Sequence, residues 1–232
     1  MKYLVIFSVV ILFIFSACKS TNPPVEPFFV SINSPKIPMG TVEAQLDRFF
    51  NMGGIDKNEF TIEYFPHEDA VCLQYRNDFI TYHQFWNREG RQVFLDAVKQ
   101  YGEDFEQRNL STKNNRNSMR RYGTVEGFLV WQTTQVSVRA MGNPKIEIGY
   151  RFRNIPDSKG RAAFLILNQR QVLHEDPITR GNNRLSPDVI IYFTRAQAET
   201  LAEFFDPHFI QTLSGIDPQT EPRSRAPELD VY

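Results

Sequence analysis

A tripeptide of metal-binding residue types occurs twice in the sequence. His67-Glu68-Asp69 and His174-Glu175-Asp176 both fall in polar connections that follow an apolar run. Imidazole nitrogens and carboxylate oxygens bind Zn²⁺, and carboxylates also suit harder cations. Two such connections meeting at one end of a sheet would form a metal site from His67, Glu68, His174 and Glu175. Consecutive residues at a strand end point in different directions. We therefore favour ordinary turn residues and expect no resident metal or cofactor.

Six arginines form a second candidate site, which would bind anions. They are Arg116, Arg120, Arg121, Arg139, Arg151 and Arg153. Arg151 and Arg153 share the polar side of one predicted strand, and the others lie in the segments before it. Clustered guanidinium groups can bind anionic headgroups, polysaccharide or the acidic patch of a partner. Glu126 and Glu147 dilute the charge, and a solvated strand face is the commoner outcome for such a pattern.

Common catalytic motifs are absent from the sequence. It has no Gly-rich phosphate loop, Gly-x-Ser-x-Gly elbow, His-Glu-x-x-His, Cys-x-x-Cys or calcium loop of the Asp-x-Asp-x-Asp-Gly kind. Cys72 lies in the apolar run Val71-Cys72-Leu73, so we interpret it as a small buried hydrophobe and not as a nucleophile. This pattern favours binding over catalysis.

The first 17 residues have the pattern of a secretory signal peptide. Lys2 precedes an uncharged, mostly apolar run from Leu4 to Phe15, and the small residues Ser16 and Ala17 follow. A helix that spans a bilayer needs roughly 20 apolar residues, and this run is shorter. A short apolar run between a basic residue and small residues is typical of a cleaved signal.

Phe15-Ser16-Ala17-Cys18 resembles the lipobox of bacterial lipoproteins, although Leu is commonest at the position that Phe15 occupies. The resemblance covers residues 1–18 and implies cleavage before Cys18, with a diacylglycerol group on its sulfur. Several acyl chains anchor a protein stably, at about 0.8 kcal/mol per buried methylene. The predicted location is therefore the bacterial cell envelope, lipid-anchored on the extracytoplasmic side of a membrane, either periplasmic or at the cell surface.

Hydrophobic periodicity in the rest of the chain predicts an α+β fold. We expect a mostly antiparallel sheet of about six or seven strands, with three or four helices packed on one face. Strict alternation predicts a strand over 145–153. A β-type run predicts another strand over 125–138, with a bulge at Gly127. A long polar stretch over 168–187 separates the predicted strands 162–167 and 189–193. Apolar spacing predicts a helix over 41–50 that starts at Thr41. A longer helix is predicted from Thr81, with Gln84 completing a capping box and Gly90 in the middle.

The predicted organisation is one domain between two segments outside it. Residues 18–40 contain five prolines and are expected to be a tether. The domain spans 41–215, and its division into halves 41–108 and 122–215, joined by a basic Asn-rich loop, is left open. Residues 216–232 are expected to be a disordered tail.

The net charge and the adjacent phenylalanine pairs indicate which kinds of binding partner to expect. The 232 residues include 26 Lys and Arg against 27 Asp and Glu, a net charge of -1, so we expect no nucleic-acid binding. Adjacent pairs at Phe28-Phe29, Phe49-Phe50 and Phe204-Phe205 cannot all point inward, so one pair is a candidate for contact with a partner or lipid.

The chain is thus predicted to be a non-catalytic binding module for a protein or other envelope component. A metal-assisted envelope hydrolase and a surface-exposed, adhesin-like protein are the alternatives.

Overall fold

The computed structural model describes residues 28–47, 55–111, 121–133, 139–154, 160–174, 184–213 and 223–225. The helices are α2 (Arg88–Glu106), α3 (Arg195–Phe205) and α4 (Pro207–Leu213). The strands of the first half are β1 (Ile37–Asp47), β2 (Ile55–Phe65), β3 (Ala70–Asn77) and β4 (Ile80–Trp86). Those of the second half are β5 (Arg121–Glu126), β6 (Phe128–Thr133), β7 (Arg139–Gly142), β8 (Lys145–Asn154), β9 (Arg161–Gln169), β10 (Leu173–His174), β11 (Arg184–Leu185), β12 (Val189–Phe193) and β13 (Arg223–Arg225).

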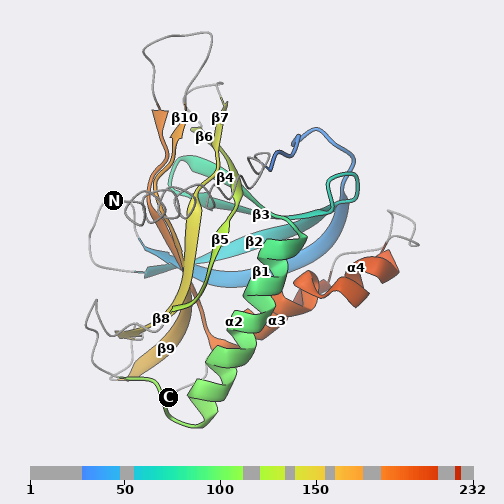
Figure 1. Cartoon of the computed structure of the whole chain (residues 1–232). Coiled ribbons are helices and arrows are strands. Elements are labelled where there is room, and N and C mark those ends of the chain that lie inside the picture. Colours follow the sequence, from blue (N-terminus) through green and yellow to red (C-terminus); the bar gives the residue numbers. More distant parts are fainter. Residues whose placement is uncertain are drawn as a thin grey trace, which may run out of the picture.

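The described part of the chain is mostly sheet. Ten strands pair antiparallel in the order β5-β8-β9-β12-β1-β2-β3-β4-β6-β7, β13 runs parallel to β1, and β10 and β11 form a separate pair. The sheet is a half-barrel that carries three helices (Figure 1). The predicted α+β fold with six or seven strands was therefore wrong, because two segments interpreted as helix are strands and one long strand is divided. Strands from both sides of residues 112–120 belong to this one sheet.

A bent hairpin links the two ends of this strand order. Only Gly127 separates β5 from β6, yet β5 pairs with β8 whereas β6 pairs with β4. On the return path, Asn143 and Pro144 separate β7, which pairs with β6, from β8. The Gly127 N–H donates to the Pro144 carbonyl oxygen at 3.1 Å, where both segments bend. The run over 125–138, predicted as one strand with a bulge at Gly127, thus changes its sheet partner there.

The curvature of the sheet is shown by a buried contact between two glutamines. Gln84 Nε2 on β4 donates to Gln169 Oε1 on β9 at 2.7 Å, although β12, β1, β2 and β3 separate these strands along the sheet. Side chains of strands so far apart can meet only on a concave face. Trp86 Nε1 donates to Gln84 Oε1 at 3.1 Å, so this amide is hydrogen-bonded within the core.

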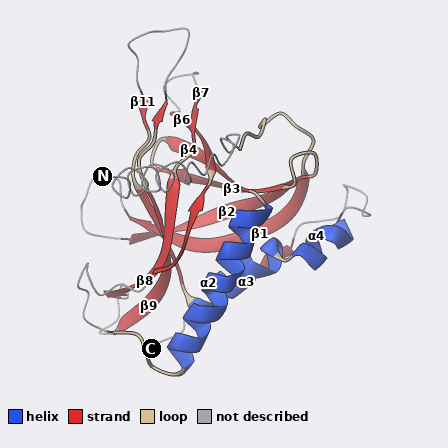
Figure 2. Cartoon of the chain, in the orientation of Figure 1, coloured by secondary structure: helices blue, strands red, loops and turns tan. Residues whose placement is uncertain are grey.

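Helices α2 and α3 cover the concave face, and α4 continues from α3 with Ile210 buried (Figures 1 and 2). On α2, Phe94 and Tyr101 face the sheet, and the Tyr101 hydroxyl donates to the Ala163 carbonyl oxygen of β9 at 3.0 Å. Phe205 of α3 packs against Phe94 and Trp86, with ring centroids 5.0 and 5.4 Å apart. Helices and sheet therefore share one aromatic core.

Residues 41–47 form part of β1 and not the predicted helix. Val42, Ala44 and Leu46 are buried in the concave core. A spacing of four, as between Val42 and Leu46, fits both the helical and the strand period, so it could not distinguish them. Residues 48–50, the rest of that predicted helix, lie outside the described residues.

The long helix begins at Arg88 and not at Thr81. Asn87 is the N-cap, and its side-chain oxygen accepts from the Gly90 N–H at 2.8 Å. Thr81 and Gln84 belong to β4, whose inward residues include the polar Gln84, and this interruption hid the alternation of the strand. Gly90 consequently lies in the first turn of α2 and not in its middle.

Two glycines let α2 and β5 approach closely, each facing a valine of the other element. A Cβ on Gly123 of β5 would lie 2.6 Å from Val93 Cγ1 of α2, and a Cβ on Gly90 would lie 2.8 Å from Val125 Cγ1 of β5. Both distances are shorter than van der Waals contact allows. The Tyr122 hydroxyl of β5 also donates to Asp104 Oδ2 of α2 at 3.0 Å, which fixes the same pairing.

We predict that Gly123→Ala destabilises the protein by about 1–3 kcal/mol, because the stiff Val93 side chain must move away from the new methyl group. The measurement is the free energy of unfolding in urea. Gly102→Ala is the matched control, since nothing lies within 4 Å of that position on α2. Alanine there should stabilise the helix by about 0.5–1 kcal/mol. Equal effects of the two substitutions would contradict the proposed close approach.

Candidate binding site

A hollow of about 410 Å³ lies over β8, β9 and β12, on the face of the sheet opposite the helices. Ile166 and Ile190 contribute apolar surface to it, and both point away from the concave core. Its polar lining comes from Arg121, Glu147, Arg151, Asn168, Arg170 and Asp188. Polar groups therefore supply more of the lining than apolar groups do, and three of the polar side chains are arginines.

Glu147 of β8 organises two of the three arginines. Arg170 Nη2 lies 3.0 Å from Glu147 Oε2, and Arg121 Nη2 lies 3.6 Å from Oε1. The Asn168 amide also donates to Glu147 Oε2, at 3.5 Å. The Glu147 side chain is only 15% exposed, whereas those of Arg121 and Arg170 are 68% and 52% exposed. One partly buried carboxylate thus holds two guanidinium groups at the edge of the hollow.

Arg151, the third arginine, has a different environment. Its Nη1 donates to the Tyr192 hydroxyl oxygen at 3.1 Å. Within the described ranges no carboxylate lies within ion-pair distance of Arg151. A guanidinium group carries five N–H donors, so Arg151 keeps donors for a further partner. It is the residue of the hollow best placed to bind an anion.

Tyr192 joins Arg151 to a neighbouring ion pair. Arg153 Nη2 lies 2.7 Å from both the Tyr192 hydroxyl oxygen and Asp47 Oδ1, and the Tyr192 hydroxyl donates to Asp47 Oδ2 at 2.9 Å. Burial raises the pKa of Tyr192, and the hydrogen bond from Arg153 offsets only part of that. Burial alone would lower the pKa of Arg153, but its bond to Tyr192 and the charge of Asp47 raise it overall. The phenol is therefore a neutral donor at pH 7, and this cluster fixes one side of Arg151.

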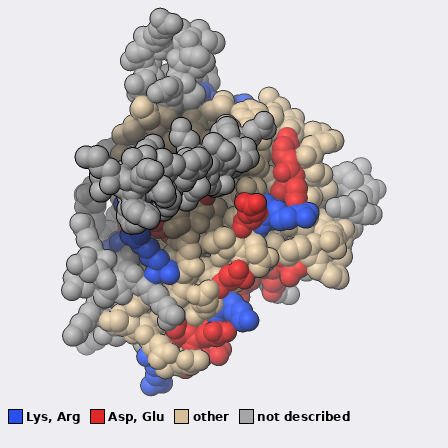
Figure 3. Space-filling model, in the orientation of Figure 1, with Lys and Arg blue, Asp and Glu red and all other residues tan. Residues whose placement is uncertain are grey.

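The structure separates the six arginines that the sequence suggested as one patch. Arg121 and Arg151 line the hollow, and Arg153 lies beside it. Arg139 lies on β7, where its Nε donates to Gln132 Oε1 at 3.3 Å. Arg116 and Arg120 lie outside the described residues. Over the face that carries the helices, acidic and basic side chains are mixed (Figure 3).

Arg170 and Asp188 were not among the site residues predicted from the sequence, and they lie just beyond β9 and just before β12. The Gln171 N–H donates to Asp188 Oδ1 at 2.8 Å, which ties these two ends together. Arg170 fell in the long polar stretch between two predicted strands, and Asp188 directly follows that stretch. The available signal was the pairing of those strands, which brings their flanking residues together.

The two His-Glu-Asp tripeptides lie in different parts of the fold. His67 and Glu68 are in the β2–β3 turn, where Glu68 Oε1 accepts from the Ser34 hydroxyl at 2.6 Å. His174 belongs to β10, and Glu175 lies outside the described residues. In the described ranges no group of three or more His, Cys, Asp and Glu residues is arranged to hold a metal ion. Cys72 is fully buried, and burial raises the pKa of its thiol.

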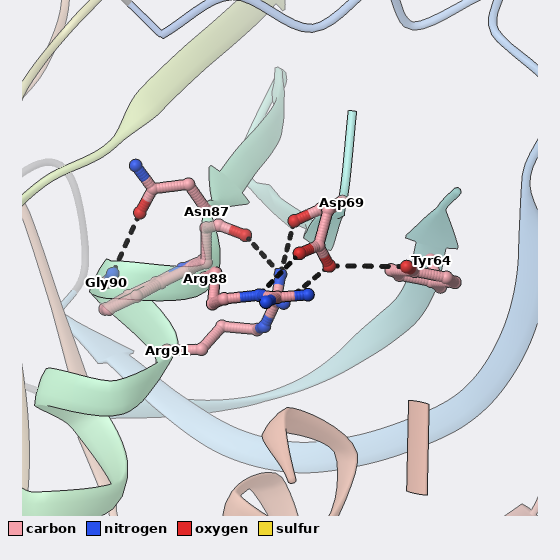
Figure 4. A network of polar contacts seen from close by, with 7 residues as sticks. Tyr64, Asp69, Asn87, Arg88, Gly90 and Arg91 are labelled. Atoms are coloured by element: carbon pink, nitrogen blue, oxygen red, sulfur yellow. Dashed lines mark hydrogen bonds and ion pairs between the residues drawn. The ribbon is translucent and has the colours of Figure 1, made fainter. Parts of the chain in front are cut away.

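Asp69 is the centre of a polar network at the start of α2 (Figure 4). Its carboxylate pairs with Arg88 Nε at 2.9 Å and with Arg91 Nη2 at 2.7 Å. Arg91 is 3% exposed and also donates to the backbone oxygens of Asp69 and Trp86. Burial raises the pKa of Asp69, but hydrogen bonds and charge from Arg91, then Arg88, lower it overall. The network connects the β2–β3 turn to the helix.

We predict that Asp69→Asn lowers the free energy of unfolding at pH 7 by about 2 kcal/mol, because it removes a charge-assisted partner of Arg91. The folded-state pKa of Asp69 is below its ordinary value of 3.8. Its contribution is therefore complete above about pH 4 and is lost as the pH falls through the folded pKa. Urea unfolding at pH 7 and pH 3 should show that the difference between variant and wild type shrinks on acidification.

Asp78→Asn is the control for this prediction. Asp78 also has a positive φ of 53°, against 45° for Asp69, and it is exposed in the β3–β4 turn. Asparagine tolerates this backbone conformation. Asp78→Asn should leave the unfolding free energy within about 0.5 kcal/mol of wild type. A difference for Asp69→Asn that does not change between pH 7 and pH 3 would contradict the role of the charge.

None of the helices in the described residues is long and apolar enough to cross a membrane. Comparison with known proteins finds a match between residues 36–212 and a family model described as "Uncharacterised Treponema protein". Neither the curated proteins nor the solved structures include a match. The matched range begins one residue before β1 and ends within α4, so it covers the sheet path and the hollow. The chain therefore belongs to this bacterial family, the uncharacterised Treponema proteins.

Proposed function

We propose that this protein is a lipid-anchored, non-catalytic binding module on the extracytoplasmic side of a bacterial membrane. The anchor is inferred from Phe15-Ser16-Ala17-Cys18, which resembles a lipobox, and from the short apolar run before it. Cys72, the other cysteine, is fully buried, so Cys18 is the thiol available for acylation. The bacterial family agrees with this type of anchor.

The environment of the Arg151 guanidinium group is the observation that supports a binding role. Its guanidinium lines the hollow, is oriented by the buried Tyr192 hydroxyl and lacks a carboxylate partner among the described side chains. Arginine binds carboxylate and phosphate through two parallel N–H donors. A cation held in place before the ligand arrives loses little conformational entropy on binding.

The remaining lining indicates the class of ligand. Arg121, Arg151 and Arg170 supply three positive charges against the two carboxylates of Glu147 and Asp188. The local excess of one positive charge suits a ligand with one anionic group. Ile166 and Ile190 contribute apolar lining, and a volume of about 410 Å³ accommodates a small molecule. The ligand we infer is a small carboxylate or phosphate compound whose body covers the two isoleucines.

We predict that Arg151→Gln weakens binding of such a ligand at least tenfold, because it removes the charge while retaining a polar side chain. The protein is the mature chain, residues 18–232, with Cys18→Ser. The probes are inorganic phosphate, glycerol 3-phosphate and glucuronate, and the measurement is isothermal titration calorimetry at low salt. At least one probe should bind wild type, and added salt should weaken that binding.

Arg139→Gln is the matched control, because Arg139 is exposed on β7 and does not line the hollow. This variant should bind the probe as wild type does. Failure of all three probes to bind, or equal binding by Arg151→Gln and wild type, would refute the site.

The anchor is tested separately. We predict that wild-type protein made in a bacterium fractionates with membranes and carries acyl groups on Cys18 in mass spectrometry. Cys18→Ser should carry no acyl groups at this position, since it lacks the sulfur that bears the diacylglycerol. An unmodified Cys18 in the wild-type protein would contradict lipid anchoring without bearing on the hollow.

A further inference from the structure

Four large apolar side chains of the described residues are exposed to solvent. They are Phe29, Met141, Leu173 and Leu185, which are 59%, 37%, 44% and 54% exposed. Single exposed apolar residues are common and need no explanation, but a group in one place usually marks a surface that binds something. The question is therefore whether these four residues lie close enough in the fold to form one surface.

Three of the four come from neighbouring strands at one end of the half-barrel. Leu173 of β10 is the direct partner of Leu185 of β11. β10 also lies beside β7, which carries Met141 (Figure 1). A Cβ on Gly142 of β7 would lie 2.9 Å from Val172 Cγ2, so the two segments are in close contact.

Phe29 extends this apolar surface along the outer face of β6. Its ring lies 5.2 Å from that of Phe128, and Phe28 lies 6.4 Å from the same ring. Val130, two residues after Phe128 on β6, is the direct partner of Met141 on β7. Phe29 and Met141 thus flank the same strand. We call Phe29, Met141, Leu173 and Leu185 the apolar end.

Phe29, a residue of the apolar end, is close in sequence to the predicted anchor at Cys18. Asn143 Nδ2 donates to the Phe28 carbonyl oxygen at 3.0 Å, and Val30 is buried, so the fold holds the chain from residue 28 onward. Cys18 precedes Phe28 by ten residues (28 − 18). Ten residues span at most about 36 Å when fully extended. A lipid on Cys18 would therefore hold Phe28 within about 36 Å of the bilayer.

We propose that the apolar end contacts the bilayer surface that holds the lipid anchor. This inference rests on the proposed acylation of Cys18. Exposed leucine, methionine and phenylalanine side chains partition into the boundary between headgroups and acyl chains. Arg139 is exposed two residues before Met141 on the same face of β7, where it suits anionic headgroups. The contact fixes how the half-barrel is oriented on the membrane, with the far end of α2 pointing away from it.

Site-specific fluorescence tests this orientation. The protein is the mature, acylated chain in vesicles of phosphatidylethanolamine and phosphatidylglycerol. Leu185→Cys carries a polarity-sensitive fluorophore, and Leu173→Cys is a second variant in case the first perturbs the fold. The native thiols do not compete, because Cys72 is fully buried and Cys18 is acylated. Gln100→Cys, on the exposed face of α2, is the matched control.

A lipid that bears a nitroxide near its headgroup is the quencher. We expect it to quench the label at 185 or 173 at least threefold more than the label at 100, with a shift of the emission to shorter wavelength only at 185 or 173. Equal quenching at 185, 173 and 100 in vesicles that float with the protein would overturn the proposed contact and leave the anchor intact. Crosslinking of 185 to a protein partner in cells, without lipid quenching, would also overturn it. An unacylated Cys18 would instead remove the anchor itself, and with it the basis of this proposal.

Discussion

The bend of one hairpin at Gly127 and Pro144 is the constraint on which the rest of this structure depends. Because β5 and β6 are consecutive but pair with opposite ends of the strand order, the sheet must curve to bring β8 and β4 to the same hairpin. A Cβ on Gly127 would lie 3.0 Å from Ile146 Cδ1 and 3.4 Å from the Phe85 carbonyl oxygen. A residue without a side chain fits this corner, as is usual where a strand bends sharply.

Curvature gives the two faces of the sheet different roles. The concave face has room for α2 and α3, whose aromatic side chains complete the core, and the buried Gln84–Gln169 pair joins the strands across it. The outer, convex face cannot pack against another part of the same sheet. Parts of it are instead covered by other residues or left open as a hollow. Residues 28–32 pack over β3, β4 and β6, and the hollow lies over β8, β9 and β12. The helices therefore complete the core, while the outer face carries the hollow and the exposed Phe29.

The parts of the fold that sequence predicted are those in which one local pattern dominates. Strict alternation from Ile146 to Phe152 predicted β8 almost to the residue. β1 was missed because a spacing of four between Val42 and Leu46 fits two periods. β4 was missed because a buried Gln84 interrupts its apolar side, and the amide of Gln84 is hydrogen-bonded in the core by Trp86 and by Gln169, which is 85 residues away. The change of strand partner at Gly127 could not be predicted from local sequence, because it depends on pairing with β8 and β4.

The candidate site follows the same division between local and long-range information. Arg121 and Arg151 were recognised because arginines near one alternating strand are visible in the sequence. Their different environments, with Arg121 held by Glu147 and Arg151 bound to Tyr192, depend on pairing among β5, β8, β9 and β12.

The pairing of β9 with β12 also connects the hollow to the apolar end, since β9 continues into β10 and β11 leads into β12. Arg170 and Asp188, at the rim of the hollow, each lie three residues along the chain from the exposed Leu173 and Leu185. A domain held to the bilayer by its apolar end would therefore present the arginines of the hollow close to the membrane surface, where anionic headgroups are concentrated.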